Sequence, residues 1–350
     1  MQLIHILPTM NPKHLTIYSI AHFLVDFSCA LLLFGSLSAS PDFALCVLFY
    51  NFCAFALQMP FGLLADSWNR NSIVAAVGCF LVALAYFVPF PMLTAIIAGM
   101  GNALFHLGGG IDTLNHSEKK ATALGIFVSP GAIGLYLGTL WGKSGTVSVW
   151  LGIIPLILVG LLILLICRQP GKGFTSENAL VSPDTVISAK WLIPLFLVVV
   201  LRSYMGMNQQ FAWKSEGSWA WILIFALALG KMAGGILMDR MGARKASLYT
   251  LIGAAILYLL SGHPIPGVLS VFLFNMTMPV TLWAVAKITP GMKGFTFGLL
   301  TFALFIGYLP SAVGAPSLLT DYWTYSVIAV LSLALLLMVY KALHKGGVSC

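Results

Sequence analysis

The sequence predicts an all-α polytopic membrane protein with 12 transmembrane helices in two pseudo-symmetric six-helix bundles. Three observations predict this class: an apolar composition, long apolar blocks, and a loop motif that occurs twice at half-length spacing. Of the 350 residues, 59% are hydrophobic and only 8% are charged. A soluble domain carries about 25% charged residues to hydrate its surface. The composition therefore argues against a soluble enzyme, a disordered protein and a nucleic-acid binder.

The apolar blocks have the length of membrane-spanning helices. A spanning helix needs about 20 apolar residues, whereas an outer-membrane barrel shows alternating segments of about 10 residues. The sequence lacks that alternation. We predict helices at 15–36, 43–65, 72–90, 92–113, 121–141, 147–167, 191–213, 218–238, 246–262, 265–286, 294–315 and 323–341. Because the intervening loops are too short for a soluble domain, we expect a monomer or a weak dimer.

The longest polar stretch lies in the middle of the chain and separates six predicted helices from six. It runs from Arg168 to Lys190. We interpret residues 1–167 as an N-terminal bundle, 168–190 as a cytoplasmic linker and 191–350 as a C-terminal bundle. The first apolar block is long and has no clear small-residue cleavage site, so we expect no cleaved signal peptide.

The formal charge of +8 follows from the placement of the 18 Lys and Arg residues. If both termini are cytoplasmic, most of these residues flank the inner ends of the predicted helices. Only Lys143 and Lys214 then lie outside, while Arg202 and Lys231 fall within helices. The positive-inside rule therefore predicts a multi-pass protein of the bacterial cytoplasmic membrane with both termini cytoplasmic. No nucleic-acid partner is needed to explain the charge.

The sequence lacks the common motifs for metal sites, nucleotide binding and hydrolase active sites. None of the 6 cysteines forms a CxxC pair, so neither a disulfide framework nor a zinc site is indicated. There is no HExxH and no GxSxG. Gly142-Lys143-Ser144 has leucine where a phosphate loop needs its upstream glycine. We therefore expect no metal, no cofactor and no enzyme activity.

One loop motif occurs in both halves, each time after the second helix of the half. Its members are Gly62, Asp66 and Arg70 in the first copy, and Gly235, Asp239, Arg240 and Arg244 in the second. The glycines allow close approach of a neighbouring helix. The aspartates end their helices where a carboxylate can contact an arginine or the positive N-terminus of another helix. We expect these contacts to form a cytoplasmic gate; simple charge flanking of a membrane helix is the alternative.

Titratable side chains lie at the centres of two helices of the N-terminal half. A buried charge there costs about 2.5–3.5 kcal/mol on insertion scales, so it indicates function by default. Asp26 lies near the centre of helix 15–36, with His22 one turn earlier on the same face. His106 lies at a similar depth in helix 92–113, and histidine is the residue type whose ordinary pKa is closest to neutral. We interpret Asp26, His22 and His106 as the proton-coupling group; a static ion pair and structural histidines are the alternatives.

Polar groups in the C-terminal half complete a predicted cavity. Arg202 lies at the centre of helix 191–213, where it would bind an anionic substrate group, pair with Asp26 or serve packing. Lys231 would either contact substrate or extend toward the cytoplasm. Further candidate substrate-binding residues are Asn102, Asn275, Tyr50, Asn51 and Tyr204. Together these side chains predict a polar cavity between the halves, near the bilayer midplane.

The repeated loop resembles the signature G-x-L-x-D-R-x-G-x-R-[RK] of the major facilitator superfamily. The second copy fits it well, and the first departs at Ser67 and Asn69. This resemblance implies a fold in which the first helix of each three-helix unit lines a central cavity. It also implies a secondary transporter.

Two neighbouring helices resemble a narrower group. The stretch from Gly101 to Gly110 reads GNALFHLGGG, and glycines recur at Gly131, Gly134 and Gly138. Both features are similar to the fosmidomycin-resistance type of bacterial drug exporter, with leucine at position 107 in place of its proline. The resemblance implies proton-coupled efflux by an antiporter.

These observations lead to one functional prediction with three alternatives. We predict a secondary active transporter that moves a small organic solute across the membrane by alternating access, coupled to protons, with efflux preferred. Its expected partners are a small-molecule substrate, protons and the lipid bilayer. The alternatives are an uptake symporter or uniporter for a small metabolite or organic anion, an intramembrane enzyme using Asp26 and His106 as acid and base, and a non-transporting sensor.

Overall fold

The computed structural model of the chain describes residues 11–117, 120–167, 187–289, 291–348 and 350. Most of the predicted linker, residues 168–186, lies outside the described part, so the linker boundaries stay a prediction.

Helices build the described chain in two halves of similar construction. The N-terminal half contains α1 (Pro12–Leu31), α2 (Phe43–Asn51), α3 (Gln58–Trp68), α4 (Asn71–Ala85), α5 (Pro91–His116), α6 (Thr122–Ser144) and α7 (Trp150–Leu162). The C-terminal half contains α9 (Leu192–Asn208), α10 (Trp219–Met241), α11 (Ala243–Leu259), α12 (Pro264–Asn275), α13 (Met278–Ile288), α14 (Lys293–Ala312) and α15 (Tyr322–Lys345).

Short π-helical and 3-10 segments lengthen several of these helices. They are η1 (Leu32–Ser36) after α1, η2 (Phe52–Ala56) between α2 and α3, η3 (Ile163–Cys167) after α7, η5 (Ala189–Trp191) before α9 and η6 (Ala212–Ser215) after α9. Within the described residues, 10 helical segments are long and apolar enough to cross a membrane, and Asn71–Ala85 is a shorter apolar helix. With α11, these segments match the twelve predicted helices one by one, which confirms the predicted fold class.

The span Pro264–Ile288 contains a break that the sequence analysis did not predict. α12 ends at Asn275 and α13 begins at Met278, with Pro279 in its first turn. Proline has no backbone N–H and clashes with the preceding turn of a continuous helix. The break brings the hydroxyls of Thr277 and Thr281 within reach of Arg202 on α9.

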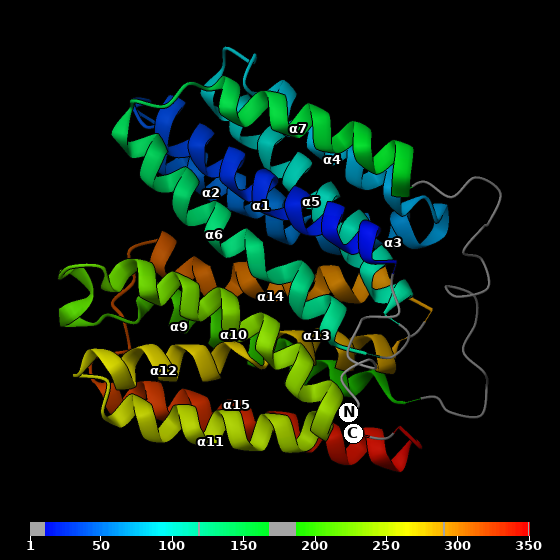
Figure 1. Ribbon diagram of the computed structural model, residues 1–350, viewed down its shortest axis with the longest axis vertical. Helices are drawn as coiled ribbons and strands as arrows, with labels where there is room; N and C mark the ends of the chain where they lie inside the picture. The colour runs from blue at the N-terminus through cyan, green and yellow to red at the C-terminus, as the bar shows by residue number, and fades with distance from the viewer. Residues whose placement is uncertain (1–10, 118–119, 168–186, 290, 349) are drawn as a thin grey trace.

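The two halves meet through two pairs of helices. α6 packs against α10, and α3 with η2 packs against α14. Glycines permit this approach: a Cβ atom at Gly298 would overlap the backbone of Gln58, and one at Gly235 would overlap the backbone of Ala121. Figure 1 shows the halves one above the other, with α6 and α14 at the seam.

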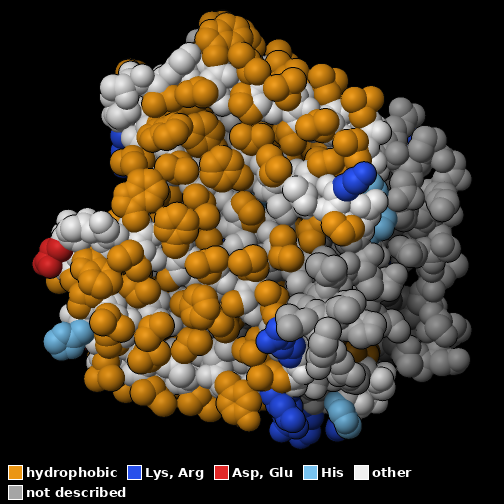
Figure 2. Space-filling model, in the orientation of Figure 1, with side chains coloured by type: hydrophobic (Ala, Val, Ile, Leu, Met, Phe, Trp, Pro, Cys, Tyr) orange, Lys and Arg blue, Asp and Glu red, His pale blue; other side chains and the backbone are white. Residues whose placement is uncertain are grey.

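Charge and apolar surface are separated along the helix axes. α1 begins and α15 ends at the same end of the molecule, called the termini side below (Figure 1). The Lys and Arg side chains visible in Figure 2 gather mainly toward this end, whereas the flank of the helices is largely apolar. This distribution suits helices embedded in a bilayer with positive charge on one side. That the termini side is cytoplasmic stays a prediction.

Candidate functional site

A cavity of about 300 Å³ lies between the two halves. The N-terminal half contributes residues of α1, η2, α3, α5 and α6, and the C-terminal half contributes residues of α9, α10, α13 and α14. Its polar and charged lining residues are His22, Asp26, Gln58, His106, Arg202, Lys231, Thr281 and Thr301. The rest of the lining is apolar side chains and one glycine. The cavity is therefore an apolar chamber with a few polar groups, as is typical of small-molecule sites.

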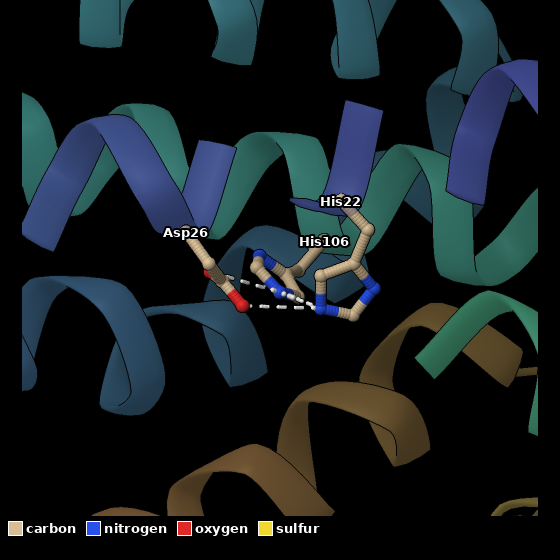
Figure 3. A group of neighbouring side chains, drawn as sticks. All are labelled: His22, Asp26 and His106. Atoms are coloured by element: carbon tan, nitrogen blue, oxygen red, sulfur yellow. Dashed lines mark hydrogen bonds and ion pairs between the residues drawn. The ribbon is translucent and has the colours of Figure 1, made fainter. Parts of the chain in front are cut away.

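Three titratable side chains converge on one wall of the cavity (Figure 3). Asp26 Oδ2 lies 3.3 Å from His22 Nε2, and Asp26 Oδ1 lies 3.7 Å from His106 Nε2. The two Nε2 atoms are 2.9 Å apart. The exposed fractions of the three side chains are small, 7% for His22, 12% for His106 and 19% for Asp26. The structure thus brings together the three residues predicted from their spacing and depth.

The hydrogen bonds of the two imidazoles define which nitrogen atoms carry hydrogen. His22 Nδ1 donates to the carbonyl of Phe127 at 2.8 Å, and His106 Nδ1 donates to the carbonyl of Asn102 at 2.9 Å. A carbonyl oxygen only accepts, so each Nδ1 carries a hydrogen and each neutral ring has a lone pair on Nε2. Two lone pairs cannot form a hydrogen bond. The contact between the Nε2 atoms therefore requires one additional proton, whose charge the Asp26 carboxylate balances.

The same three side chains could also offer ligand atoms to a metal ion, since these atoms lie within 4.8 Å of one another. Ligand atoms on a tetrahedral zinc ion, with Zn–N bonds of about 2.0–2.1 Å, lie about 3.3 Å apart. The distance of 2.9 Å between the two Nε2 atoms is shorter and matches a hydrogen bond. The geometry favours a proton over a metal ion.

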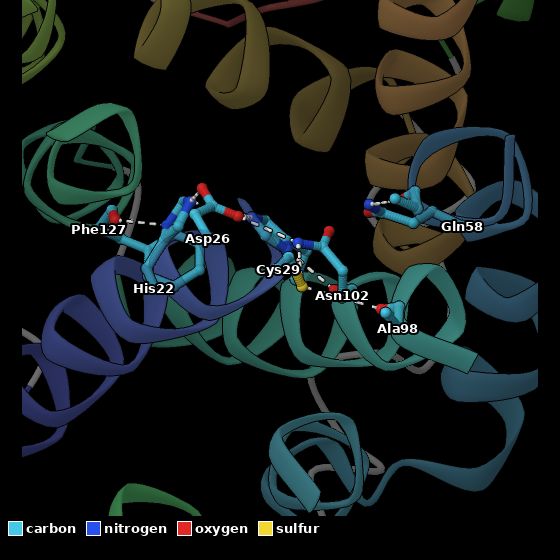
Figure 4. Close-up of polar contacts among 9 residues, drawn as sticks. His22, Asp26, Cys29, Gln58, Ala98, Asn102 and Phe127 are labelled. Atoms are coloured by element: carbon cyan, nitrogen blue, oxygen red, sulfur yellow. Dashed lines mark hydrogen bonds and ion pairs between the residues drawn. The ribbon is translucent and has the colours of Figure 1, made fainter. Parts of the chain in front are cut away.

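Neighbouring groups hold the cluster in place (Figure 4). Asn102 Nδ2 donates to Asp26 Oδ1 at 3.1 Å and also lies 3.8 Å from Cys29 Sγ. Gly131 of α6 faces the cluster, and a Cβ atom there would overlap His22 Nε2 and Asp26 Oδ2. Asn102 is thus a supporting residue behind the cluster and does not line the cavity.

The opposite wall carries two cations from the C-terminal half. The Arg202 guanidinium donates to Thr277 Oγ1 at 2.9 Å and to Thr281 Oγ1 at 3.4 Å. Its Nε atom is buried and has no hydrogen-bond partner in the described part of the chain. Among the described residues, neither Arg202 nor Lys231 has a carboxylate within 4.0 Å. These two side chains are the only lysine and arginine among the described residues that line the cavity.

The remaining predicted substrate-binding residues do not line this cavity. Asn51 and Asn275 donate to carbonyls of their own helices, at Val47 and Val271. Tyr50 is buried beside Cys29. The Tyr204 hydroxyl accepts a hydrogen bond from the backbone N–H of Leu318, 2.7 Å away, in the loop before α15. Their roles in substrate binding stay predictions, without support from cavity geometry.

Other lining residues were missed by the sequence analysis. Gln58 is fully buried, and its Oε1 has no hydrogen-bond partner among the described residues, although its amide nitrogen donates to Ala54. Thr281 and Thr301 also line the cavity. An uncharged amide inside an apolar block, four residues before Gly62, was the available signal for Gln58.

The repeated loop motif joins the two halves on the termini side. Asp66, in α3, accepts hydrogen bonds from the backbone N–H groups of Gly294 and Phe295 at 2.7 and 2.9 Å. Asp239, in α10, accepts from the backbone N–H groups of Ala121 and Thr122 at 2.7 and 2.9 Å. Each aspartate therefore caps a helix of the other half, α14 or α6. The helix dipole strengthens such contacts.

The glycine and arginine members of the motif have different roles. A Cβ atom at Gly62 would overlap the backbone of Gly294, so this glycine brings the two helices into contact. The side chains of Arg70, Arg240 and Arg244 are exposed, and in the described residues none lies within 4.0 Å of a carboxylate. Of the contacts considered for the aspartates, the structure shows those with helix N-termini.

The first copy of the motif departs from the signature at the residue that ends its helix, where asparagine replaces glycine. Asn69 stands where the second copy has Gly242, and both residues have positive φ, 52° and 86°. Asparagine tolerates the left-handed region better than most residues with a side chain. The two turns differ in ψ, which is 45° at Asn69 in the left-handed helical region and 155° at Gly242.

Comparison with known proteins shows the fold. No protein-family model matches the chain, and no curated protein matches it in sequence. The chain is similar to the crystal structure of a single-residue variant of the E. coli fucose:proton symporter, FucP, with a TM-score of 0.66 and 14% sequence identity. The match covers 94% of this chain and 98% of that chain. Together with its apolar spans, this likeness identifies a multi-pass membrane protein with the major facilitator fold.

Proposed function

We propose that the chain is a secondary active transporter that moves a small organic solute across the membrane by alternating access, coupled to protons. One observation carries the proposal: the Asp26–His22–His106 cluster, whose geometry requires an additional proton, lines a cavity between the two halves. A cavity at the interface of two repeats is where transporters of this type bind solute and coupling ion. Likeness to a protein named as a proton symporter also supports proton coupling.

The proton would change the attraction between the two walls of the cavity. With the proton bound, the positive charge on the histidine pair balances the Asp26 carboxylate. Without it, the cluster is negative and faces the positive side chains of Arg202 and Lys231 on the other half. Opposite charges attract strongly where water is scarce. Proton release and solute binding would therefore compete to set the distance between the halves.

Efflux is the preferred direction, on the resemblance of α5 and α6 to the fosmidomycin-resistance type of exporter. Uptake of an organic anion is the second candidate, and a specific observation favours it. Arg202 and Lys231 bring two cations to an apolar cavity that contains one carboxylate, Asp26. A charge in this environment is stabilised only by a partner. A solute with a carboxylate or phosphonate group would supply that partner.

We assign the termini side to the cytoplasm, because Lys and Arg side chains gather there. The caps formed by Asp66 and Asp239 join the two halves on this side. We therefore expect the cytoplasmic side to be closed while both caps are formed, and these contacts would favour the outward-facing state of the transport cycle. Transport would require both caps to break when the halves rock around the cavity.

A solute screen followed by a flux assay tests this function. Purified protein would be screened by thermal shift at two pH values against small organic anions, each matched with its neutral amide. Any stabilising compound would then be offered to proteoliposomes. We expect net movement of the unmodified compound. A chemically altered product without flux would indicate an intramembrane enzyme, and binding of a protein partner without flux would indicate a sensor.

A further inference from the structure

A series of polar side chains runs along the interface of α1 and α5. It starts at the cavity cluster and continues past it. On α1, four residues follow one another at four-residue intervals, which places them on one face of the helix. They are His14, Tyr18, His22 and Asp26, and their neighbours on α5 are His116, Asp112, His106 and Asn102. Because α1 begins and α5 ends on the termini side, the series leads from the cavity toward that side.

Each residue of α1 in the series is paired with one residue of α5, which gives four levels along the helices. At three of these levels the two side chains are linked by a hydrogen bond. Asp26 and Asn102 are linked at 3.1 Å, His22 and His106 at 2.9 Å, and the Tyr18 hydroxyl donates to Asp112 Oδ2 at 2.5 Å. The fourth level is a ring contact between His14 and His116, with centroids 6.3 Å apart.

Asp112 is a second buried carboxyl group, and the cavity mechanism does not use it. Its exposed fraction is 4%, and its Oδ1 atom has no hydrogen-bond partner among the described residues. The groups that face it are Tyr18 and His14 of α1, His116 of its own helix, Asn71 of α4 and Cys167 of η3. None of these is a lysine or an arginine. A carboxyl group that is buried in a membrane bundle, and that meets no lysine or arginine among the described residues, is a candidate functional group.

Asp112 lies between the cavity cluster and the termini side, where a route for protons would be needed. The caps of Asp66 and Asp239 hold the halves together at this end. On the proposed function they would close the direct aqueous route from the cavity to the termini side. The interior of the N-terminal half, along α1 and α5, offers an alternative. This argument rests on the proposed function, because it needs a proton on the Asp26 cluster.

We propose that Asp112, with Tyr18, His14 and His116, is a second proton-binding site through which the Asp26 cluster exchanges its proton with the termini side. The proton leaves the histidine pair to a water molecule, which passes a proton to the Tyr18 oxygen. The Tyr18 hydroxyl proton moves at the same time to Asp112 Oδ2 along the existing hydrogen bond. Asp112 then delivers a proton to His14 or His116, next to the termini side. Tyr18 and the water molecule end unchanged, and one proton has moved.

The test compares two modes of transport by the full-length protein in proteoliposomes. Solute exchange at equal pH needs no net proton movement, whereas accumulation driven by a pH gradient does. For Asp112→Asn we expect exchange within about twofold of the wild type and a loss of driven accumulation of at least about tenfold. Asp42→Asn, an exposed acid on the opposite side, is the matched control and should leave both modes unchanged. Asp112→Asn protein that keeps driven accumulation, or loses both modes equally, would overturn the proposal.

Tyr18→Phe keeps the proposal testable if Asp112→Asn does not fold. It removes only the hydroxyl that donates to Asp112. We expect the pH at which driven accumulation is half-maximal to shift by at least about 0.5 unit, since a relay step would be lost. An unchanged pH profile would reject the relay. Wild-type protein that exchanges solute but is never driven by pH would refute proton coupling, and this proposal with it; wild-type protein without exchange would refute transport itself.

Discussion

The interaction of three side chains across two helices decides the chemistry of the cavity wall. His22 and Asp26 share a face of α1, and His106 reaches them from α5. Each imidazole is fixed by a backbone carbonyl through its other nitrogen. The fixed rings leave little freedom for the Nε2 atoms to avoid each other. The cluster is therefore built to hold a proton, and small displacements of its members should impair it.

Replacing Gly131 tests how tightly the cluster is held. The added methyl group of Gly131→Ala would overlap His22 Nε2 and Asp26 Oδ2, and should force the imidazole away from the carbonyl of Phe127. Misplacement by about 1 Å can reduce a positioned reaction about 100-fold. We expect folded protein with driven transport reduced at least about tenfold, measured in proteoliposomes. Gly206→Ala, where an added methyl meets nothing within 4 Å, is the control; equal activity of the two variants would refute this packing argument.

Lys231 tests the charge of the solute. If it binds an anionic group, Lys231→Gln removes a charged hydrogen bond of about 1.5–3 kcal/mol. Affinity for an anionic solute should then fall about 10- to 100-fold, while the matched neutral amide is unaffected. Titration calorimetry or a thermal-shift series would measure both. Lys214→Gln, an exposed lysine of η6, provides the comparison. Equal losses for anion and amide would show that Lys231 supports packing.

At the level of elements, the two halves are joined by reciprocal helix caps. A carboxylate at the end of α3 binds the start of α14, and a carboxylate at the end of α10 binds the start of α6. Glycine in the preceding turn of each motif copy, Gly62 or Gly235, allows the backbones to touch. The repeat in the sequence is thus a repeat in function, since each copy closes the same side of the molecule.

Removing both caps should open the termini side. Loss of a cap costs about 0.5–2 kcal/mol. Loss of both caps therefore costs about 1–4 kcal/mol, and about one to two kcal/mol already shifts a two-state equilibrium roughly 5- to 30-fold. In a cysteine-free background, spin labels at positions 67 and 292 would report the separation of α3 and α14. In the Asp66→Ala, Asp239→Ala double variant we expect a second population of molecules in which the distance between the two labels is longer. It should be absent from Asp42→Ala, whose carboxylate forms no side-chain cap bond; identical distance distributions would exclude a gating role.

For the whole molecule, the sequence was enough to predict the twelve helices and the pairing of the halves, because apolar length and charge placement act locally. The break between α12 and α13 was missed, because transmembrane helices tolerate proline and Pro279 alone therefore does not predict an interruption. Asp66 and Asp239 were expected to bind an arginine or a helix N-terminus. Only the packing of the halves distinguishes these partners.

The sequence predicts how deep in the membrane each polar side chain of the candidate site lies, but not whether that side chain points into the cavity. Asp26, His22 and His106 follow from four-residue spacing and similar depth, and all three line the cavity. Asn275 has a similar depth, yet its amide turns to its own helix, which the sequence does not reveal. Asp112 was missed because it lies near the end of a predicted helix, where an acid is ordinarily hydrated; its burial arises from packing against α1 and α4.

The most direct test of the whole account is pH-driven transport by Asp26→Asn in proteoliposomes, with solute exchange measured in the same preparation. The variant keeps the size of the side chain and removes the carboxylate that balances the proton on the histidine pair. We predict that it inserts, folds and still exchanges solute, but that a pH gradient no longer drives net movement. Driven transport at the wild-type rate would contradict the central claim that the cavity between the halves couples solute to protons through Asp26.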